Sequence, residues 1–353
     1  MKDTTNAVRA AFAQQAKWCE ALGSPLTALV LDQVGKHLDR SSPVACRILD
    51  WPLEGLVASA LPLRVAAGLH GLVRRGSLPG LAMHYPPNAL PAGTAAIRAF
   101  SQQIEYAFID SGTELSPWLD SPPQTNEVAR SAILMAGLTE VTARTRRPIA
   151  LHELGASAGL NLIPDRYDHD LGHARVGQLH AQLRLSPQWR GAPLPSARVV
   201  IATRRGVDLD PLDVTNATHR ERLMAYIWAD QHERLARIAI AIEIARRHPP
   251  KVDAGDAADW TEQHFHGRSG MTSVLMHSVA MQYFPATSQA RIIAHVQALG
   301  QRATQGAPIA WLRFEMPVDR VAPPVLTLTL WPGGIERVLA HGSAHGHWIN
   351  WLG

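Results

Sequence analysis

An acidic residue, a serine and two glycines lie close together after a short apolar run near the middle of the chain. The run spans residues 149–152, and it is followed by Glu153, Gly155, Ser157 and Gly159. Glycines permit a tight turn and a close approach of a ligand to backbone amides, and a carboxylate at a strand end accepts hydrogen bonds. We therefore predict a strand, a glycine-bearing turn and a helix starting at Ser157, arranged to hold a nucleotide-like cofactor.

Two more acidic residues come after predicted strands. Asp208 follows the strand predicted at 199–203, and Asp256 follows the short strand predicted at 251–254. Because the carboxyl ends of parallel strands meet at one edge of a sheet, we expect these acids near the first turn, where a ribose diol needs an acceptor. Asp210 stays open as an alternative to Asp208. A capping or turn carboxylate is the alternative role for each acid taken singly.

The same turn also matches the Gly-x-Ser-x-Gly pattern that exposes a nucleophilic serine in α/β-hydrolases. Ser157 would then need a later acid and histidine, and Asp256 with His277 or His345 can nominally serve. Such a serine normally follows several strands, whereas mostly helical sequence precedes this one, and the other acids at strand ends are left without a role. A serine esterase and a catalytically silent binding or regulatory module remain alternatives.

Helical periodicity dominates the chain up to about residue 147 and predicts a helical domain at 1–123. The expected helices lie at 5–22, 24–39, 54–75, 93–109 and 126–145. Asn126 suits the N-cap of the last of these, with Glu127 in its first turn. Arg130 on the same helix is expected either to bind a ligand carboxylate or to form an ion pair with Glu127 or Glu140.

After Pro148, strands alternate with helices, which is typical of a parallel sheet. Beyond the strands above, we expect strands at 273–277 and 309–314, a hairpin at 325–331 and 336–340, and helices at 216–247 and 288–302. The predicted fold class is α/β, with a Rossmann-like, seven-stranded, mostly parallel sheet that ends in an antiparallel hairpin within 124–353. Residues 163–197 are long for a connection, so we expect an insertion over the active face.

The composition favours a globular, cytoplasmic protein without a membrane span. The chain has 353 residues, of which 46% are hydrophobic, and its two cysteines, Cys19 and Cys46, suggest no disulfide framework. The tryptophans are scattered rather than arrayed, which disfavours a nucleic-acid module. His345 and His347 have no third ligand at metal-binding spacing, so we predict no metal site.

The order of these motifs resembles the class I S-adenosylmethionine-dependent methyltransferase fold. It runs from Glu-x-Gly-x-Ser-x-Gly through Gly-Val-Asp-Leu-Asp-Pro and Gly-Asp-Ala to an apolar strand that carries His277 and Ser278. More specifically, residues 125–131, 153–162 with 165–167, and 277–278 resemble an uncharacterised bacterial family, DUF2332. This second resemblance spans most of the chain and implies no established substrate.

The methyltransferase resemblance implies S-adenosylmethionine as the cofactor and an unknown small or medium-sized acceptor. The residues that it places around the methionine and ribose parts are Glu153, Gly155, Ser157 and Gly159. It further implies that Asp208 receives the ribose hydroxyls and that Asp256 and Ala257 flank the adenine. His277 and Ser278 would line the floor near the reactive methyl, and His277 is the base that we would name first. Ser157 stands where the middle glycine of the motif is common, so the register stays open.

Overall fold

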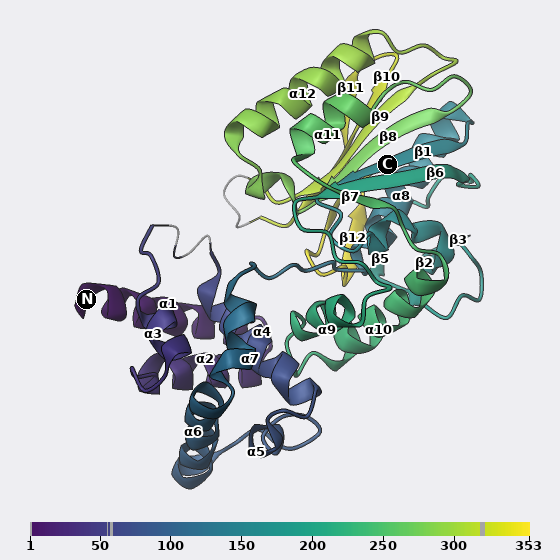
Figure 1. Cartoon of the computed structure of the whole chain (residues 1–353). Helices are drawn as coiled ribbons and strands as arrows, with labels where there is room; N and C mark the ends of the chain where they lie inside the picture. Colours follow the sequence, from purple (N-terminus) through teal and green to yellow (C-terminus); the bar gives the residue numbers. More distant parts are fainter. Residues whose placement is uncertain (1, 55, 57–58, 318–321) are drawn as a thin grey trace. The chain divides into compact units, whose positions relative to one another are not determined.

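The computed structural model describes residues 2–54, 56, 59–317 and 322–353 (Figure 1). The chain forms two compact units, one of Met1–Thr125 with Ala217–Ala236, and one of Asn126–Asn216 with Arg237–Gly353. The sequence led us to expect one division after residue 123, and it did not reveal that 217–236 return to the first unit. Positions 55, 57 and 58 of the helix predicted at 54–75 lie outside the described residues.

The first unit consists of helices around an apolar core that includes Phe12, Leu31 and Phe100. Its helices are α1 (Lys2–Ala21), α2 (Pro25–His37), α3 (Pro43–Leu49), α4 (Leu61–Arg74), α5 (Pro79–Ala82), α6 (Gly93–Asp110), α7 (Gly112–Leu115) and α9 (Ala217–Ala225), with the 3-10 turn η1 (Ser116–Leu119). The predicted N-terminal helical region is confirmed. The three shortest α-helices were not predicted, because a single turn or two leaves too little periodicity to recognise.

The single long helix predicted at 216–247 is wrong, because the chain breaks between α9 and α10 (His232–Arg247). Asp230 in the break accepts hydrogen bonds from the Ser24 hydroxyl and, at 2.9 Å, from the backbone N–H of Leu26 in the first turn of α2. The first amides of a helix have no partner within it, so a carboxylate there is favourable. This contact joins segments about 200 residues apart, and local periodicity does not report it.

A nine-stranded mixed sheet forms the centre of the second unit, in the order β5-β12-β11-β10-β9-β8-β1-β6-β7. Its parallel strands are β1 (Ile149–Leu154), β6 (Ile201–Asp208), β7 (Val252–Ala254), β8 (Thr272–Ser278) and β9 (Ile309–Glu315). The antiparallel strands β10 (Val325–Trp331), β11 (Ile335–Gly342) and β12 (Trp348–Trp351) follow, and β5 (Gln188–Gly191) pairs in parallel with β12. The α/β class and the large, mostly parallel sheet are confirmed. The predicted number of seven strands is wrong, because β12 and β5 extend the sheet.

Helices cover both faces of this sheet (Figure 1). On one face, α11 (Ala257–His264) and α12 (Ala286–Gln301) pack around an apolar cluster that includes Ile292 and Trp311. On the other face, α8 (Arg130–Thr145) lies so close that a Cβ on Gly137 would come within 2.6 Å of Leu312. Trp311 and Leu312 are neighbours on β9, and side chains alternate along a strand, so the two helical layers lie on opposite faces.

Residues 163–197 form a small substructure and an edge strand. β2 (Asp168–Leu171), β3 (Ala174–Gly177) and β4 (Arg184–Leu185) make a three-stranded sheet, and β5 then joins the main sheet. Trp189 on β5 stacks on Trp351 of β12, with ring centroids 5.7 Å apart, and this contact holds the edge strand in place. The expected insertion therefore enlarges the sheet at the side far from β1.

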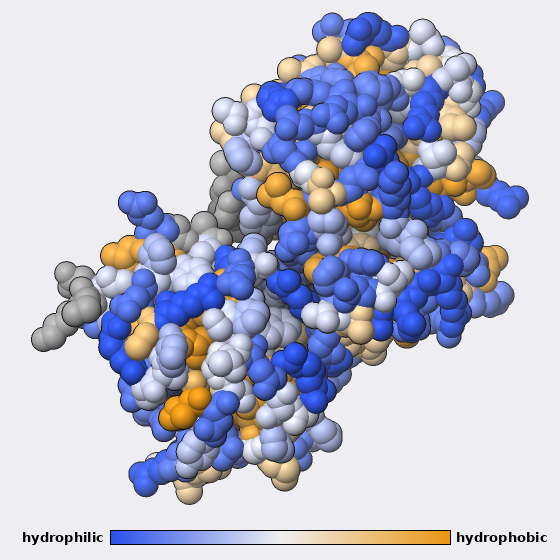
Figure 2. Space-filling model, viewed as in Figure 1, coloured by the Kyte–Doolittle hydropathy of each residue, from blue (hydrophilic) through white to orange (hydrophobic). Residues whose placement is uncertain are grey.

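The described residues contain no helix that is long and apolar enough to cross a membrane. On the face shown in Figure 2, exposed apolar residues lie scattered among hydrophilic ones. Within the same described part of the chain, no three His, Cys, Asp or Glu side chains gather in a way that could hold a metal ion.

Candidate functional site

The turn after β1 is tight, but no α-helix follows it. Gly155, Ser157 and Gly159 have φ values of 65°, 52° and 70°. These left-handed conformations cannot belong to a right-handed helix, and only the short 3-10 turn η2 (Leu160–Leu162) follows. The helix predicted from Ser157 is therefore wrong. Because there is no helix here, there is also no helix dipole to attract an anion to the turn.

The two glycines of the turn are explained by packing against the protein. A Cβ on Gly155 would lie 2.8 Å from the Cβ of Ala280, in the segment after β8. A Cβ on Gly159 would lie 2.7 Å from Cγ of Pro250 and 2.9 Å from Val252 at the start of β7. Both positions also have positive φ, which glycine adopts most readily. The glycines thus shape the turn, and close approach of a ligand is not needed to explain them.

Glu153 on β1 is a buried acid with an unsatisfied oxygen. The residue is 2% exposed, and Oε2 has no hydrogen-bond partner among the described residues. Burial raises the pKa of this carboxyl well above its ordinary value, and the charge of Asp208 raises it further, whereas Arg130 opposes the rise. The buried Oγ of Ser157 also has no partner in this part of the chain. Since buried polar atoms are nearly always hydrogen-bonded, a polar ligand at this edge would find two atoms ready to receive it.

Asp208, the last residue of β6, holds the turn. Its Oδ2 accepts a hydrogen bond of 2.8 Å from the backbone N–H of Ser157, and its Oδ1 accepts one of 3.1 Å from the backbone N–H of Asp210. Asp210 itself is exposed. The parallel pairing of β1 with β6 therefore brings Asp208, and not Asp210, to the same corner of the sheet as Glu153.

Asp256 caps the helix α11. Its Oδ1 accepts hydrogen bonds from the backbone N–H groups of Ala258 (2.8 Å) and Asp259 (3.1 Å), and its Oδ2 accepts one from the Ser288 hydroxyl (3.2 Å). Burial alone would raise the pKa of Asp256, but these hydrogen bonds outweigh burial and lower it. Ala257 is buried in the apolar cluster beneath α11 and α12. Both residues thus have structural roles, and a place beside an adenine stays a prediction.

His277 on β8 belongs to a closed hydrogen-bonded group. The indole N–H of Trp311 donates to Nε2 of His277 at 3.1 Å, so Nε2 is an acceptor and the proton of the neutral ring is on Nδ1. Nδ1 in turn donates to Oε1 of Glu315 at 2.5 Å. His277 is 1% exposed, and both of its nitrogens are engaged. Its role as a catalytic base stays a prediction that this geometry does not support.

His277 and Glu153 also point to opposite faces of the sheet. Glu153 is in register with Met276, and residues paired in register share a face. His277 is the next residue, so it lies on the face covered by α11 and α12, while Glu153 lies on the face covered by α8. Ser278 ends the strand, and its carbonyl accepts a hydrogen bond of 3.1 Å from Nη1 of Arg130. Strand register, which the sequence pattern does not contain, thus separates His277 from Glu153.

Arg130 is the first residue of α8, so the helix begins four residues later than predicted. Asn126 is therefore not its N-cap. Instead, Oδ1 of Asn126 accepts a hydrogen bond of 2.9 Å from the backbone N–H of Leu160, which ties the segment before α8 to the turn after β1. Arg130 is buried, and its Nε donates to the carbonyl of Ala344 at 2.8 Å. Arg130 belongs to α8, the helix on the face of the sheet that carries Glu153, and its charge opposes the rise in the pKa of that acid.

Glu315, which was not predicted from the sequence, organises the His277 group. Its Oε1 accepts hydrogen bonds from His277 and from the backbone N–H groups of Ala280 (3.0 Å) and Met281 (3.3 Å). Burial would raise the pKa of Glu315, but these donors outweigh burial and lower it. The signal was present, because Glu315 directly follows the strand predicted at 309–314. The same strand-end criterion that selected Glu153 and Asp208 also selects this residue.

A protein-family model matches almost the whole chain. It is described as "Uncharacterized protein conserved in bacteria (DUF2332)", and the match covers residues 9–351. No curated protein and no solved structure matches the chain. The matched range includes residues of both units.

Proposed function

The chain belongs to the DUF2332 family, and we propose that it binds S-adenosylmethionine at the corner formed by β1 and β6 and transfers the methyl group to a small or medium-sized acceptor. The observation that carries the proposal is the buried carboxyl of Glu153, with its unsatisfied Oε2 and its raised pKa. S-adenosylmethionine has a sulfonium and an ammonium group. Either positive charge, placed beside Glu153, would stabilise the ionised carboxyl that burial disfavours.

The order of the parallel strands supports a nucleotide site at this corner. Numbered along the chain, β7-β6-β1-β8-β9 is the order 3-2-1-4-5 of doubly wound nucleotide-binding sheets. Ligands of such sheets bind outside the carboxyl ends of the strands, where the order reverses. Here it reverses between β1 and β8, and Glu153 lies near the carboxyl end of β1.

The residues present fit the methionine and ribose parts of the cofactor better than its adenine. Glu153 offers a negative charge and Ser157 a hydroxyl group whose oxygen is unsatisfied. The two oxygens of Asp208 accept hydrogen bonds from the backbone N–H groups of Ser157 and Asp210, and a carboxylate oxygen is also the kind of acceptor that a ribose hydroxyl needs. When bound, S-adenosylmethionine supplies an electrophilic methyl group. The protein then has to align the acceptor with that group, and alignment alone provides much of the rate of a displacement.

Calorimetric titration with S-adenosylmethionine tests the proposal. We expect micromolar binding to the wild-type chain and a loss of about tenfold or more in the Glu153→Gln variant, which keeps the size of the side chain but removes its charge. Adenosine has no positive charge, so its affinity should be the same for both proteins. Asp210→Asn changes an exposed acid two residues beyond Asp208 and should leave S-adenosylmethionine binding unchanged. An absence of binding to the wild-type chain would falsify the proposal.

A serine esterase is the second candidate, and the conformation of Ser157 favours it. Its φ of 52° and its unsatisfied Oγ fit the strained turn that exposes the nucleophile of α/β-hydrolases. However, no α-helix follows the turn, and among the described residues no histidine bonds to that oxygen. Labelling of Ser157 by a fluorophosphonate probe would support the esterase, and an unlabelled protein would exclude it. Cofactor binding without turnover in any acceptor extract would indicate a catalytically silent module.

A further inference from the structure

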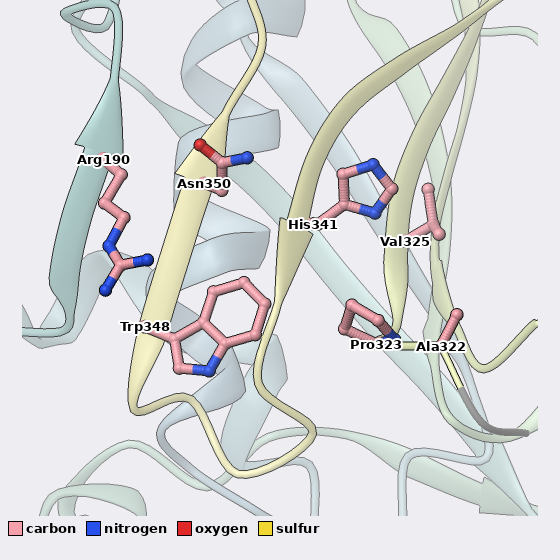
Figure 3. A pocket seen from close by; sticks show the side chains of 7 residues that line it. All are labelled: Arg190, Ala322, Pro323, Val325, His341, Trp348 and Asn350. Atoms are coloured by element: carbon pink, nitrogen blue, oxygen red, sulfur yellow. The ribbon is translucent and has the colours of Figure 1, made fainter.

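A pocket of about 450 Å³ lies on the second unit, over strands that the sequence analysis did not connect with any function (Figure 3). Its lining residues are Arg190, Ala322, Pro323, Val325, His341, Trp348 and Asn350. Pockets for small molecules commonly have volumes of about 300 to 1,000 Å³, so the size suits a small ligand. None of these described lining residues is acidic, and one of them, Arg190, carries a permanent positive charge.

Four of the lining residues form a row across adjacent strands. Arg190 on β5 pairs with Asn350 on β12, Asn350 pairs with His341 on β11, and His341 pairs with Val325 on β10. Residues in register share a face and follow one another at about 4.8 Å, the spacing of strands in a sheet. Figure 3 shows Asn350 and Trp348 on one strand, between Arg190 on one side and His341 on the other. Backbone pairing therefore holds this row at a fixed spacing.

The polar side chains of the row are not used within the described structure. No described residue forms a side-chain hydrogen bond or ion pair with Arg190, His341 or Asn350. Next to the row, Glu315 on β9 pairs in register with Val325. Its Oε1 already accepts three hydrogen bonds, from His277 and from two backbone N–H groups. The donors of Arg190, Asn350 and the Trp348 indole thus line the pocket (Figure 3), and no side-chain acceptor for them lies among the described residues.

We propose that this row is a binding site for a small molecule that carries a carboxylate or phosphate group on a flat, apolar body. The planar guanidinium of Arg190 matches such an oxyanion, and the side-chain amide of Asn350 adds a donor beside it. The indole of Trp348 and the ring of Pro323 provide apolar surface for the body of the ligand. Val325 pairs with the last residue of β9, so the row lies at the carboxyl edge, where open α/β sheets bind ligands. This proposal does not rest on the binding of S-adenosylmethionine at the corner of β1 and β6.

Ligand-observed NMR titrations of the full chain with benzoate and phenyl phosphate test the site, in the absence of S-adenosylmethionine. Benzyl alcohol has the same ring without the charge, and benzylamine has the opposite charge. We expect saturable binding of at least one anion and no saturable binding of the alcohol or the amine. A preference for benzoate assigns the site to carboxylates, and a preference for phenyl phosphate assigns it to phosphate esters. If neither anion binds saturably at millimolar concentration, the proposal is wrong.

Two variants, with a third as control, test whether the anion binds in this pocket. Arg190→Gln should lower the affinity for the anion by about tenfold, because it removes a charge-assisted hydrogen bond. The substitution should not lower the melting temperature, because Arg190 is exposed. Arg337→Gln is the matched control, since Arg337 is an exposed arginine on β11 that does not line the pocket. Equal weakening by both variants would mean nonspecific attraction and would overturn the proposal. Trp348→Leu should weaken the binding of phenyl phosphate but not that of inorganic phosphate, because inorganic phosphate has no flat body to pack on the indole.

Discussion

Glu153 and Glu315 are two acids near the carboxyl ends of parallel strands, and they differ in the groups that surround their carboxyl oxygens. Both are largely buried: Glu153 is 2% exposed as a whole residue, and the side chain of Glu315 is 20% exposed. Burial raises the pKa of both carboxyls. At Glu315, however, His277 and two backbone N–H groups donate hydrogen bonds and reverse the shift. At Glu153 nothing described bonds to Oε2, and the neighbouring Asp208 adds to the shift.

The difference teaches that burial at a strand end does not identify a functional acid. The Glu315 group is complete within the protein, and it has the features of a structural element that joins β8 and β9. The Glu153 corner is incomplete, and an incomplete buried group is where a ligand changes the energy most. This is why our proposal for the cofactor rests on Glu153, although the sequence analysis had given His277 the catalytic role.

The largest expected effect is at Glu315. Glu315→Ala leaves three donors without their acceptor, and the free energy of unfolding of the second unit should fall by about 3 kcal/mol. The control is Glu336→Ala, since Glu336 is an exposed acid paired with Arg313; it should change the free energy by less than about 1 kcal/mol. Urea unfolding, monitored through hydrogen exchange of strand amides, measures the free-energy change in both variants. Equal losses in the two variants would show that the Glu315 group is not a structural element.

A smaller effect is expected at Gly155, where the two regions touch. Gly155→Ala places a side chain in a left-handed conformation and pushes against Ala280, whose N–H donates to Glu315. We expect a loss of about 2 kcal/mol in the free energy of unfolding. Gly255→Ala is the control, because a Cβ at Gly255 has no neighbour within 4 Å. In the double variant with Glu315→Ala, the total loss should be smaller than the sum of the two single losses. A strictly additive loss would mean that the two regions are not coupled.

The smallest expected effects concern the pH dependence of stability. The folded-state pKa of Glu153 is raised above its ordinary 4.5, so the stability contributed by its proton is present below pH 4.5 and is lost as pH rises toward the folded pKa. Glu153→Gln removes that loss, and its advantage over the wild type should grow as pH rises. The pKa of Glu315 is lowered, so its contribution is present above pH 4.5 and is lost as pH falls through the folded pKa. Glu315→Gln should therefore cost most at neutral pH. The midpoint of urea unfolding can be measured for the wild type and both variants between pH 4 and pH 8. If both variants shift this midpoint in the same direction relative to the wild type, the comparison is refuted.

Local sequence patterns were sufficient for most strands and for the helical region. The strands predicted at 309–314 and 325–331 are β9 (Ile309–Glu315) and β10 (Val325–Trp331), almost residue for residue. A buried strand needs a run of apolar residues, and a run is visible without knowing its neighbours. The edge strands β5 and β12 have only four residues each, and they depend on contacts such as Trp189 with Trp351, so no local pattern revealed them.

The sequence by itself determined that this is an α/β chain with a helical N-terminal region and that acids follow the first parallel strands, including the glutamate that carries our proposal. Only the tertiary structure decided that no helix follows Ser157, because contacts with Ala280 and Pro250 hold the turn in left-handed conformations. It also decided that hydrogen-bond donors surround the carboxyl group of Glu315 and not Oε2 of Glu153. The hydrogen bond between His277 and Glu315 joins residues 38 positions apart, and strand register puts Glu153 on the other face. Such partners are set by pairing across the sheet, which no single segment of sequence contains.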